Sequence, residues 1–171
     1  MRPIWNIIAV AVCLPLAGQQ GPKPSSPPPA AVFSITLNGP TEPIRMGTPV
    51  NVKVTLTNVS GKDIYLRFER GPNMAYRGFS YSFVKGGRES ETTLFHRQLT
   101  AKLRPDDAAP PLGSSSIVLS YPPGPIFTAT IDLSRLYEIK EPGQYTLVVS
   151  RFDEDSKTMV HSNSLSLKMM P

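Results

Sequence analysis

The sequence has very few of the residues on which catalytic and metal chemistry depends. Among 171 residues there is one cysteine, Cys13, and there are two histidines, His96 and His161. A single cysteine excludes an intramolecular disulfide and any zinc site built on several thiolates. Two isolated histidines are too few for a three-ligand catalytic zinc site, and no Gly-x-Ser-x-Gly elbow accompanies them. We therefore expect no enzymatic activity, no cofactor and no zinc.

Charge is sparse and evenly spread. Charged residues make up 18% of the chain, with 18 Lys and Arg against 13 Asp and Glu, for a formal net charge of +5. The basic residues never form a block or a stripe, which is the footprint that nucleic-acid binding requires. We expect no nucleic-acid partner, and we interpret the excess charge as an aid to solubility.

The N-terminus has the three parts of a secretory signal. In "MRPIWNIIAVAVCLPLAGQQG", Arg2 supplies a positive charge, residues 4–16 are mostly apolar, and residues 16–18 are suited to cleavage. The apolar run is shorter than the ~20 residues that a membrane span needs. We predict a signal peptide at residues 1–18, a secreted or periplasmic mature protein, and no membrane span in that mature chain.

Cys13 leaves one alternative open. The tetrapeptide "VAVC", residues 10–13, is slightly similar to the lipobox of lipid-anchored bacterial proteins. However, Val12 stands where a small residue is normal, and the apolar run continues beyond the cysteine. Anchoring through Cys13 is therefore the alternative to free export.

A proline-rich linker follows the signal. Residues 19–31 read "QQGPKPSSPPPAA", with five prolines between positions 22 and 29. Such a segment favours extended polyproline II and cannot form a helix ladder. The folded domain is expected to occupy residues 32–171.

From residue 32 onward, apolar and polar residues alternate in short runs. In "PVNVKVTLTN", residues 49–58, every second side chain is Val or Leu, which is the period of a half-buried strand. The pattern recurs in "VFSITL", "IYLRF", "GFSYSFV", "SSIVLSY", "IFTATIDL", "QYTLVVSRF" and "TMVHSNSLSLKM". Turn formers such as Ser60-Gly61 and Pro142-Gly143 separate these runs. The pattern predicts an all-β domain, an antiparallel sandwich of about seven to nine strands.

Two segments interrupt this alternation. Residues 89–107 are ambiguous between strand, short helix and loop, and residues 104–116, "RPDDAAPPLGSSS", are expected to form a long irregular connection. Loops of that length in a compact domain are either crossovers or binding elements.

Two stretches resemble immunoglobulin-like domains. "GTPVNVKVTLTNVSGKDIYLRF" is similar to the B-to-C strand region of secreted bacterial immunoglobulin-like domains, and also to small bacterial proteinase-inhibitor sandwiches. "IDLSRLYEIKEPGQYTLVVSRF" resembles the E-to-F region of immunoglobulin-like and fibronectin type III sandwiches. The resemblance implies an immunoglobulin-like sandwich, and it says little about function because this architecture has many unrelated roles.

The second stretch also implies a structural corner. Pro142 and Gly143 lead to Tyr145, which holds the place of the corner tyrosine in these domains. In such a corner the ring is buried and the hydroxyl donates to a backbone carbonyl a few residues upstream.

An acidic cluster invites a comparison of two interpretations. Asp153, Glu154 and Asp155 could offer oxygen ligands to calcium, together with Asp106 and Asp107 from another loop. Consecutive residues cannot all face one ion on an ordinary backbone, and the spacing is not that of an EF-hand loop. We favour a charged, solvated hairpin turn with Lys157 and Arg151 as local partners, and keep calcium as the minority hypothesis.

The functional prediction is a binding module. We expect a secreted, monomeric, non-enzymatic protein-interaction or accessory domain. Tyr76 and Arg77, in a loop before an aromatic-rich strand, are the candidate partner contacts. The alternative is a proteinase-inhibitor-like binder that presents the loop 70–78 or the loop 104–116.

Overall fold

The described chain is built almost entirely from strands. The computed structural model describes residues 30–71, 73–107 and 115–171, so the predicted signal peptide and all but the last two residues of the predicted linker lie outside it. The described strands are β1 (Phe33–Asn38), β2 (Ile44–Arg45), β3 (Asn51–Asn58), β4 (Ile64–Arg70), β5 (Ser80–Lys85), β6 (Arg88–Glu89), β7 (Ser115–Tyr121), β8 (Gly124–Asp132), β9 (Gly143–Asp153), β10 (Thr158–His161) and β11 (Leu165–Met170). The helical segments are α1 (Leu94–Leu99) and two 3-10 turns, η1 (Met74–Tyr76) and η2 (Leu133–Arg135).

The prediction of an all-β domain is confirmed, with two differences in detail. One pair, β2 with β11, is parallel, whereas every other described pair of strands is antiparallel. The described strands also outnumber the seven to nine expected, because β2 and β6 have two residues each and show no periodic pattern. In addition, the last alternating run is divided into β10 and β11.

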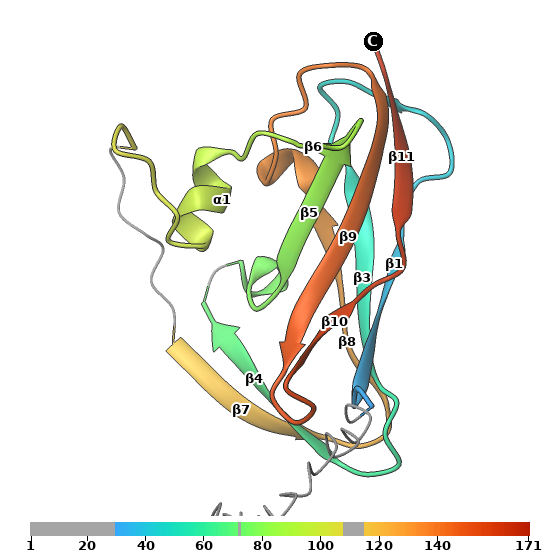
Figure 1. Cartoon of the computed structure of the whole chain (residues 1–171), viewed down its shortest axis with the longest axis vertical. Helices are drawn as coiled ribbons and strands as arrows, with labels where there is room; N and C mark the ends of the chain where they lie inside the picture. Colours follow the sequence, from blue (N-terminus) through green and yellow to red (C-terminus); the bar gives the residue numbers. More distant parts are fainter. Residues whose placement is uncertain (1–29, 72, 108–114) are drawn as a thin grey trace, which may run out of the picture.

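The strands form two main sheets and a smaller ribbon. One sheet has the order β1-β3-β8, and the other has the order β2-β11-β9-β5-β6, with β10 also paired to β9. Figure 1 shows the sheet that contains β9 and β5 in front of β3, β1 and β8. The third unit is the β4–β7 ribbon, a two-stranded sheet of β4 and β7.

The core lies between the two main sheets. Val52, Val54 and Leu56 of β3 are fully buried, and so are Leu147 and Val149 of β9. Each set occupies alternate positions of its strand, so the period-2 pattern places one face of each sheet against the other. Burying such a side chain contributes about 1.5–3 kcal/mol, so these rows supply much of the driving force for folding.

The β4–β7 ribbon is fixed to the first sheet at Asn58, the last residue of β3. The Asn58 side chain is 3% exposed, and its amide donates to the carbonyl of Lys62 at 2.9 Å and to that of Tyr121 at 3.0 Å. Its side-chain oxygen accepts from the backbone N–H of Ser60 at 2.9 Å. One buried amide therefore joins the turn before β4 to the end of β7.

The division between β10 and β11 allows the second sheet to bond to the first. Both strands pair with β9, and their registers differ by one residue, which is the signature of a bulge. Within the bulge, Asn163 accepts from the backbone N–H of Leu37 at 2.8 Å and donates to the Leu37 carbonyl at 3.2 Å. Its amide thus acts as a strand partner for the end of β1.

The corner expected at Tyr145 has the geometry of a tyrosine corner. The Tyr145 hydroxyl donates to the carbonyl of Glu141, four residues upstream, at 2.8 Å, and the residue is 4% exposed. Its ring stacks on that of Phe83 with 4.8 Å between centroids. Gly143 has φ 140°, and a Cβ there would lie 2.9 Å from Cε of Lys85, so glycine is needed at this position.

Replacing Tyr145 with phenylalanine should lower the free energy of unfolding by about 1 kcal/mol, because one hydrogen bond is lost while the ring packing is kept. Urea denaturation checks this. Tyr65→Phe is the matched control, since Tyr65 is 68% exposed and should be neutral. An unchanged midpoint for Tyr145→Phe would contradict the role of the hydroxyl.

Candidate binding cleft

A cleft opens beside the short helix. The α1 cleft, as we call it, has a volume of about 550 Å³ and is lined by residues 76–80, by residues 98–102 at the end of α1, and by Glu69, Arg151, Phe152 and Met159. These residues come from β4, η1 and the start of β5, the helix, and the β9–β10 hairpin. The cleft therefore lies where the β4–β7 ribbon, the helix and the second sheet meet.

The floor of the cleft depends on a tight turn before β5. Asn73 has φ 71° and Gly78 has φ 75°, so the chain turns through left-handed conformations on both sides of η1. Tyr76 is 7% exposed, and its hydroxyl accepts from the backbone N–H of Asp132 at 3.1 Å. A Cβ on Gly78 would lie 2.8 Å from Nη1 of Arg151, so glycine allows the guanidinium to approach the backbone.

Arg151 is a buried cation of the cleft. It is 7% exposed, and its guanidinium donates to the carbonyls of Arg67 and Gly78. The guanidinium carbon lies 4.8 Å from the ring centroid of Phe68 and 5.4 Å from that of Phe79. Such cation–π contacts and backbone acceptors stabilise a buried guanidinium without neutralising its charge.

Positive charge is in excess within the cleft. Within the described part of the chain, neither Arg151 nor Lys102 forms an ion pair, whereas Arg77 pairs with Glu69 at 2.8 Å. Three cations therefore line the cleft with one carboxylate. Burial lowers the pKa of Arg151, although nearby Tyr121 and Glu69 oppose the change. An anion in the cleft would compensate this buried charge.

Exposed apolar side chains border the charged floor. Phe152 is 45% exposed and Met159 is 46% exposed, and the two lie opposite one another on β9 and β10. Leu99 of α1 lines the same cleft. Aromatic residues, methionine and arginine are the side chains that protein interfaces favour.

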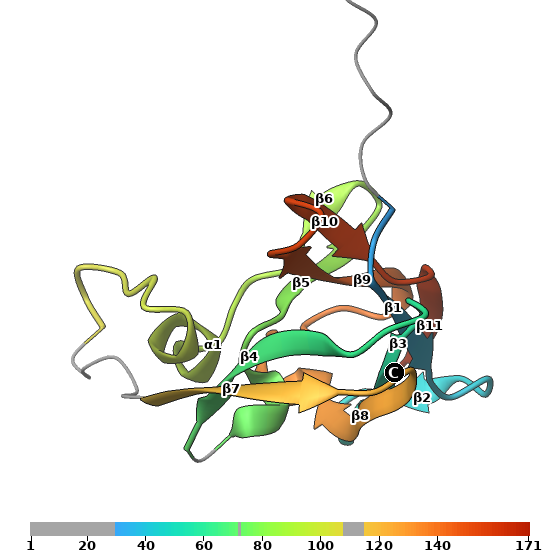
Figure 2. The same cartoon turned by 90° about the horizontal axis from the view of Figure 1, so that it is seen from below.

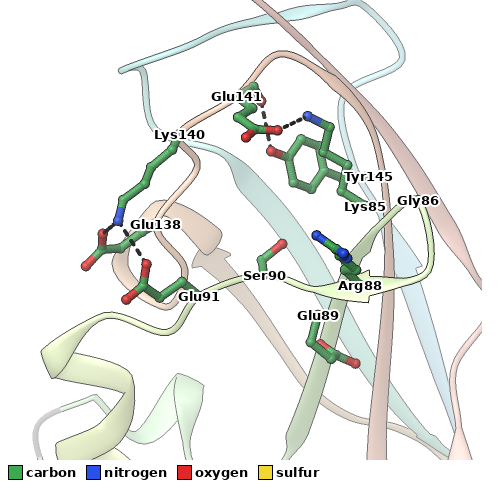
Figure 3. A pocket seen from close by; sticks show the side chains of 10 residues that line it. All are labelled: Lys85, Gly86, Arg88, Glu89, Ser90, Glu91, Glu138, Lys140, Glu141 and Tyr145. Atoms are coloured by element: carbon green, nitrogen blue, oxygen red, sulfur yellow. Dashed lines mark hydrogen bonds and ion pairs between the residues drawn. The ribbon is translucent and has the colours of Figure 1, made fainter.

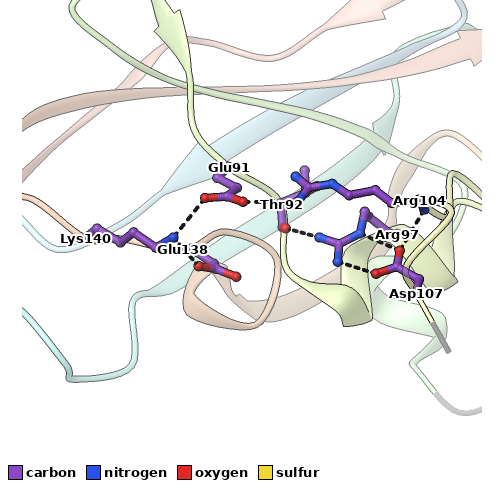
Figure 4. A network of polar contacts seen from close by, with 7 residues as sticks. All are labelled: Glu91, Thr92, Arg97, Arg104, Asp107, Glu138 and Lys140. Atoms are coloured by element: carbon purple, nitrogen blue, oxygen red, sulfur yellow. Dashed lines mark hydrogen bonds and ion pairs between the residues drawn. The ribbon is translucent and has the colours of Figure 1, made fainter. Parts of the chain in front are cut away.

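The helix that forms one wall is held by local hydrogen bonds. Thr93 caps α1 by accepting from the backbone N–H of His96 at 3.2 Å. Arg97 donates to both carboxylate oxygens of Asp107, at 2.7 and 2.6 Å, and also to the carbonyl of Thr92 (Figure 4). The Arg97 guanidinium and the backbone N–H of Arg104 together lower the pKa of Asp107 to about 2.

A second pocket, of about 350 Å³, is polar, and most of its charged side chains form ion pairs. Figure 3 shows its lining around Tyr145, with Lys85 bonded to Glu141 at 2.6 Å. On its other side Lys140 pairs with Glu91 at 2.9 Å and with Glu138 at 2.8 Å. Arg88 also lines this pocket and forms no ion pair in the described residues, but it is exposed to solvent, so the pocket has less need of a charged ligand than the α1 cleft with its buried Arg151.

Glu154 and Asp155 lie in the exposed hairpin turn that we favoured, between β9 and β10, whereas Asp153 is the buried last residue of β9, so the expectation of a solvated turn is wrong for Asp153. Asp153 is 1% exposed and accepts from the backbone N–H groups of Val32 and Asp155, both at 3.0 Å, and from the Ser156 hydroxyl at 2.7 Å. Glu154 is exposed and lies 3.5 Å from Lys157. In the described residues, no group of three or more His, Cys, Asp or Glu side chains could hold a metal ion. The calcium hypothesis for Asp153, Glu154 and Asp155 gains no support.

The interpretation of Arg151 as a partner of this turn is wrong. Its side chain lies on the inner face of β9, in phase with Tyr145, Leu147, Val149 and Asp153, all of which are buried. This phase was a signal available in the sequence, because alternate residues of one strand share a face. The charge of Arg151 favours an exposed side chain, whereas the alternation of β9 places this side chain on the buried face of the strand.

The expectation that Tyr76 and Arg77 are exposed is also wrong, although both residues line the α1 cleft. Tyr76 packs edge-on against Phe95 at 5.5 Å between centroids, and Arg77 is 5% exposed. Tyr76 and Arg77 therefore pack against the domain, whereas Met74 in the same segment is exposed. Of the other suggested loop, 104–116, residues 108–114 lie outside the described residues.

The two histidines lie in different environments. His161 is exposed on β10, whereas His96 is 9% exposed with its ring 5.2 Å from Tyr137 and 6.4 Å from Tyr81 between centroids. Burial and the charge of Lys102 lower the pKa of His96, while a hydrogen bond to the Leu136 carbonyl opposes them. At neutral pH His96 is thus an uncharged residue of helix α1.

Comparison with known proteins adds no family assignment. No family model matches the chain, and no curated protein matches it. Among the residues described, no helix has the length and apolarity needed to cross a membrane.

The Arg97–Asp107 pair predicts a pH dependence of stability. The folded-state pKa of Asp107, about 2, lies below the unfolded value of about 4. Its contribution is therefore complete above the unfolded pKa and is lost as the pH falls from about 5 toward about 2. Thermal unfolding should show wild type more stable than Asp107→Asn at neutral pH, with the difference shrinking on acidification.

Asp63→Asn is the matched control, because Asp63 is exposed and outside this network. A difference between wild type and Asp107→Asn that stays constant down to the lowest pH would contradict the assignment.

Proposed function

We propose that the protein is an exported, non-catalytic, immunoglobulin-like β-sandwich that binds an acidic segment of another protein in the α1 cleft. The observation that carries the proposal is the excess of positive charge in the cleft, from the buried Arg151 and the exposed Lys102. Arg151 and Lys102 have no carboxylate partner in the described residues, and both line the cleft. A carboxylate from a partner would supply the missing counter-charge.

Export is supported by the N-terminal sequence. A basic residue, a short apolar run and small residues precede a proline-rich segment, which is the order expected of a signal peptide and a spacer. A spacer of this kind would hold the domain away from a neighbouring surface. Anchoring through Cys13 stays the alternative and would leave the binding site unchanged.

A non-catalytic role is supported by the environment of the histidines. Neither His96 nor His161 bonds to a carboxylate in the described residues, so neither is oriented as a general base. The His96 side chain bonds to the backbone carbonyl of Leu136, within the core-facing wall of the helix. These contacts favour a structural histidine.

A protein segment fits the cleft better than a small anion because of its apolar border. Phe152 and Met159 form an exposed cross-strand pair next to the cationic floor. A small anion would leave this pair in water, whereas a peptide could place a carboxylate on the floor and an apolar side chain on the pair. The preferred segment should therefore combine Asp or Glu with neighbouring apolar residues.

The inhibitor-like alternative is not favoured by any feature of the described residues. It requires an exposed loop that enters a protease active site, and the segment of Tyr76 and Arg77 is packed inward. The alternative remains testable, because inhibition of a panel of secreted proteases by the purified domain would support it.

Panning a random peptide library on the purified mature chain tests the proposal. The enriched peptides should combine acidic and apolar residues, and their affinity should fall about tenfold for Lys102→Glu and for Phe152→Ser. Both residues are exposed, so the substitutions should leave the fold intact. Fluorescence anisotropy of a labelled peptide measures the affinity.

The chain offers matched controls for both substitutions. Lys168→Glu and Met170→Ser reverse a charge and remove an apolar group at exposed positions on β11, away from the cleft lining. They should bind the peptides as the wild type does. Failure to enrich acidic peptides, or equal binding by the cleft variants, would refute the proposed site.

A further inference from the structure

The outer strand of the β4–β7 ribbon has an edge without a strand partner. In the described residues β7 pairs with β4 alone, across seven residue pairs from Ile64↔Tyr121 to Arg70↔Ser115. Figure 2 shows β7 lying beside β4 along its whole length. The N–H and C=O groups on the other edge of β7 are therefore available to a further strand.

This edge lacks the features that normally prevent strand addition. Natural edge strands carry lysine, proline or a bulge, or are very short. In contrast, β7 reads "SSIVLSY", and no charged residue occurs between Asp107 and Asp132. Val118 is 53% exposed and Leu119 is 40% exposed, so apolar side chains accompany the unpaired edge.

The sequence of β7 is complementary to itself. If two copies pair antiparallel about Val118, Ile117 lies opposite Leu119 and Ser116 lies opposite Ser120. Since this register keeps each residue on its own face of the ribbon, like side chains meet at the centre of the strand, and only Ser115 opposite Tyr121 at the two ends is unmatched. No like charges face one another, because the strand has none.

We propose that β7 is a self-association edge, on which a second copy of this chain pairs antiparallel to form a four-stranded sheet, β4-β7-β7-β4. The two-fold axis passes through Val118, so the contact is closed and stops at a dimer. This surface is distinct from the α1 cleft, and it replaces our expectation of a monomer.

The chain's own linker is a poor alternative occupant. Residues 22–29 contain five prolines, each of which lacks the N–H that a ladder requires. A strand from a different protein would also fit the edge, but the symmetric match of Ile117 with Leu119 favours a second copy.

Charge exchange at the symmetry axis tests this inference. In the dimer Val118 faces its own copy, so Val118→Lys alone and Val118→Glu alone should both be monomeric. An equimolar mixture should dimerise again, because lysine then faces glutamate. Sedimentation velocity of the mature chain, from micromolar to millimolar concentration, should show a concentration-dependent dimer for the wild type and for the mixture only.

Tyr65→Lys is the matched control. Tyr65 is 68% exposed on β4, one strand away from the seam, and should leave dimerisation intact. Val118 lies opposite Arg67, so Val118→Glu gains a cross-strand partner and should fold, which circular dichroism checks. A wild type that stays monomeric throughout the range overturns the inference. Dimers of either single variant, or a mixture that stays monomeric, overturn the proposed register.

Discussion

The buried guanidinium of Arg151 joins parts of the fold that no strand ladder connects. The β4–β7 ribbon does not pair with β9 or β5, yet Arg151 of β9 donates to the carbonyl of Arg67 on β4 and to that of Gly78 before β5. Its flat face also packs against Phe68 and Phe79. Losing this side chain would remove both hydrogen bonds and the two ring contacts at once, which is costly for the packing of the β4–β7 ribbon on β9.

The same contacts of Arg151 explain why the α1 cleft carries positive charge. Backbone carbonyls and aromatic faces stabilise the cation but carry no net negative charge, so the charge of Arg151 is compensated only in part, by the nearby carboxylate of Glu69. Glu69, the one carboxylate of the lining, is bonded to Arg77. Under the proposed function, one arginine thus both closes the core and prepares a site for an acidic ligand.

Much of the fold could be predicted from the sequence because half-buried strands show a regular alternation of apolar and polar residues. The alternation in β3 and the Pro-Gly-x-Tyr pattern before β9 identified a core strand and the hydrogen-bonded corner at Tyr145. The bulge at Asn163 could not be predicted from the sequence. It depends on hydrogen bonds between Asn163 and Leu37 of β1, which are far apart in the sequence.

The binding cleft was predictable only in part. The period of β9 places Arg151 inward, although its charge suggested a solvated turn. The burial of Tyr76 follows from its bond to Asp132, a contact across 56 positions that no local pattern reveals. Lys102 follows a six-residue helix, which is too short for a clear periodic signal.

The central claim is that Arg151 presents an incompletely compensated charge to an acidic partner. An NMR titration that follows the Nε–H signals of the arginine side chains, with a short peptide of alternating leucine and aspartate, tests it most directly. We predict that the Arg151 signal shifts saturably, while that of Arg45, exposed on β2, does not move. A peptide that leaves Arg151 unaffected, or that shifts both arginines equally, would contradict the claim.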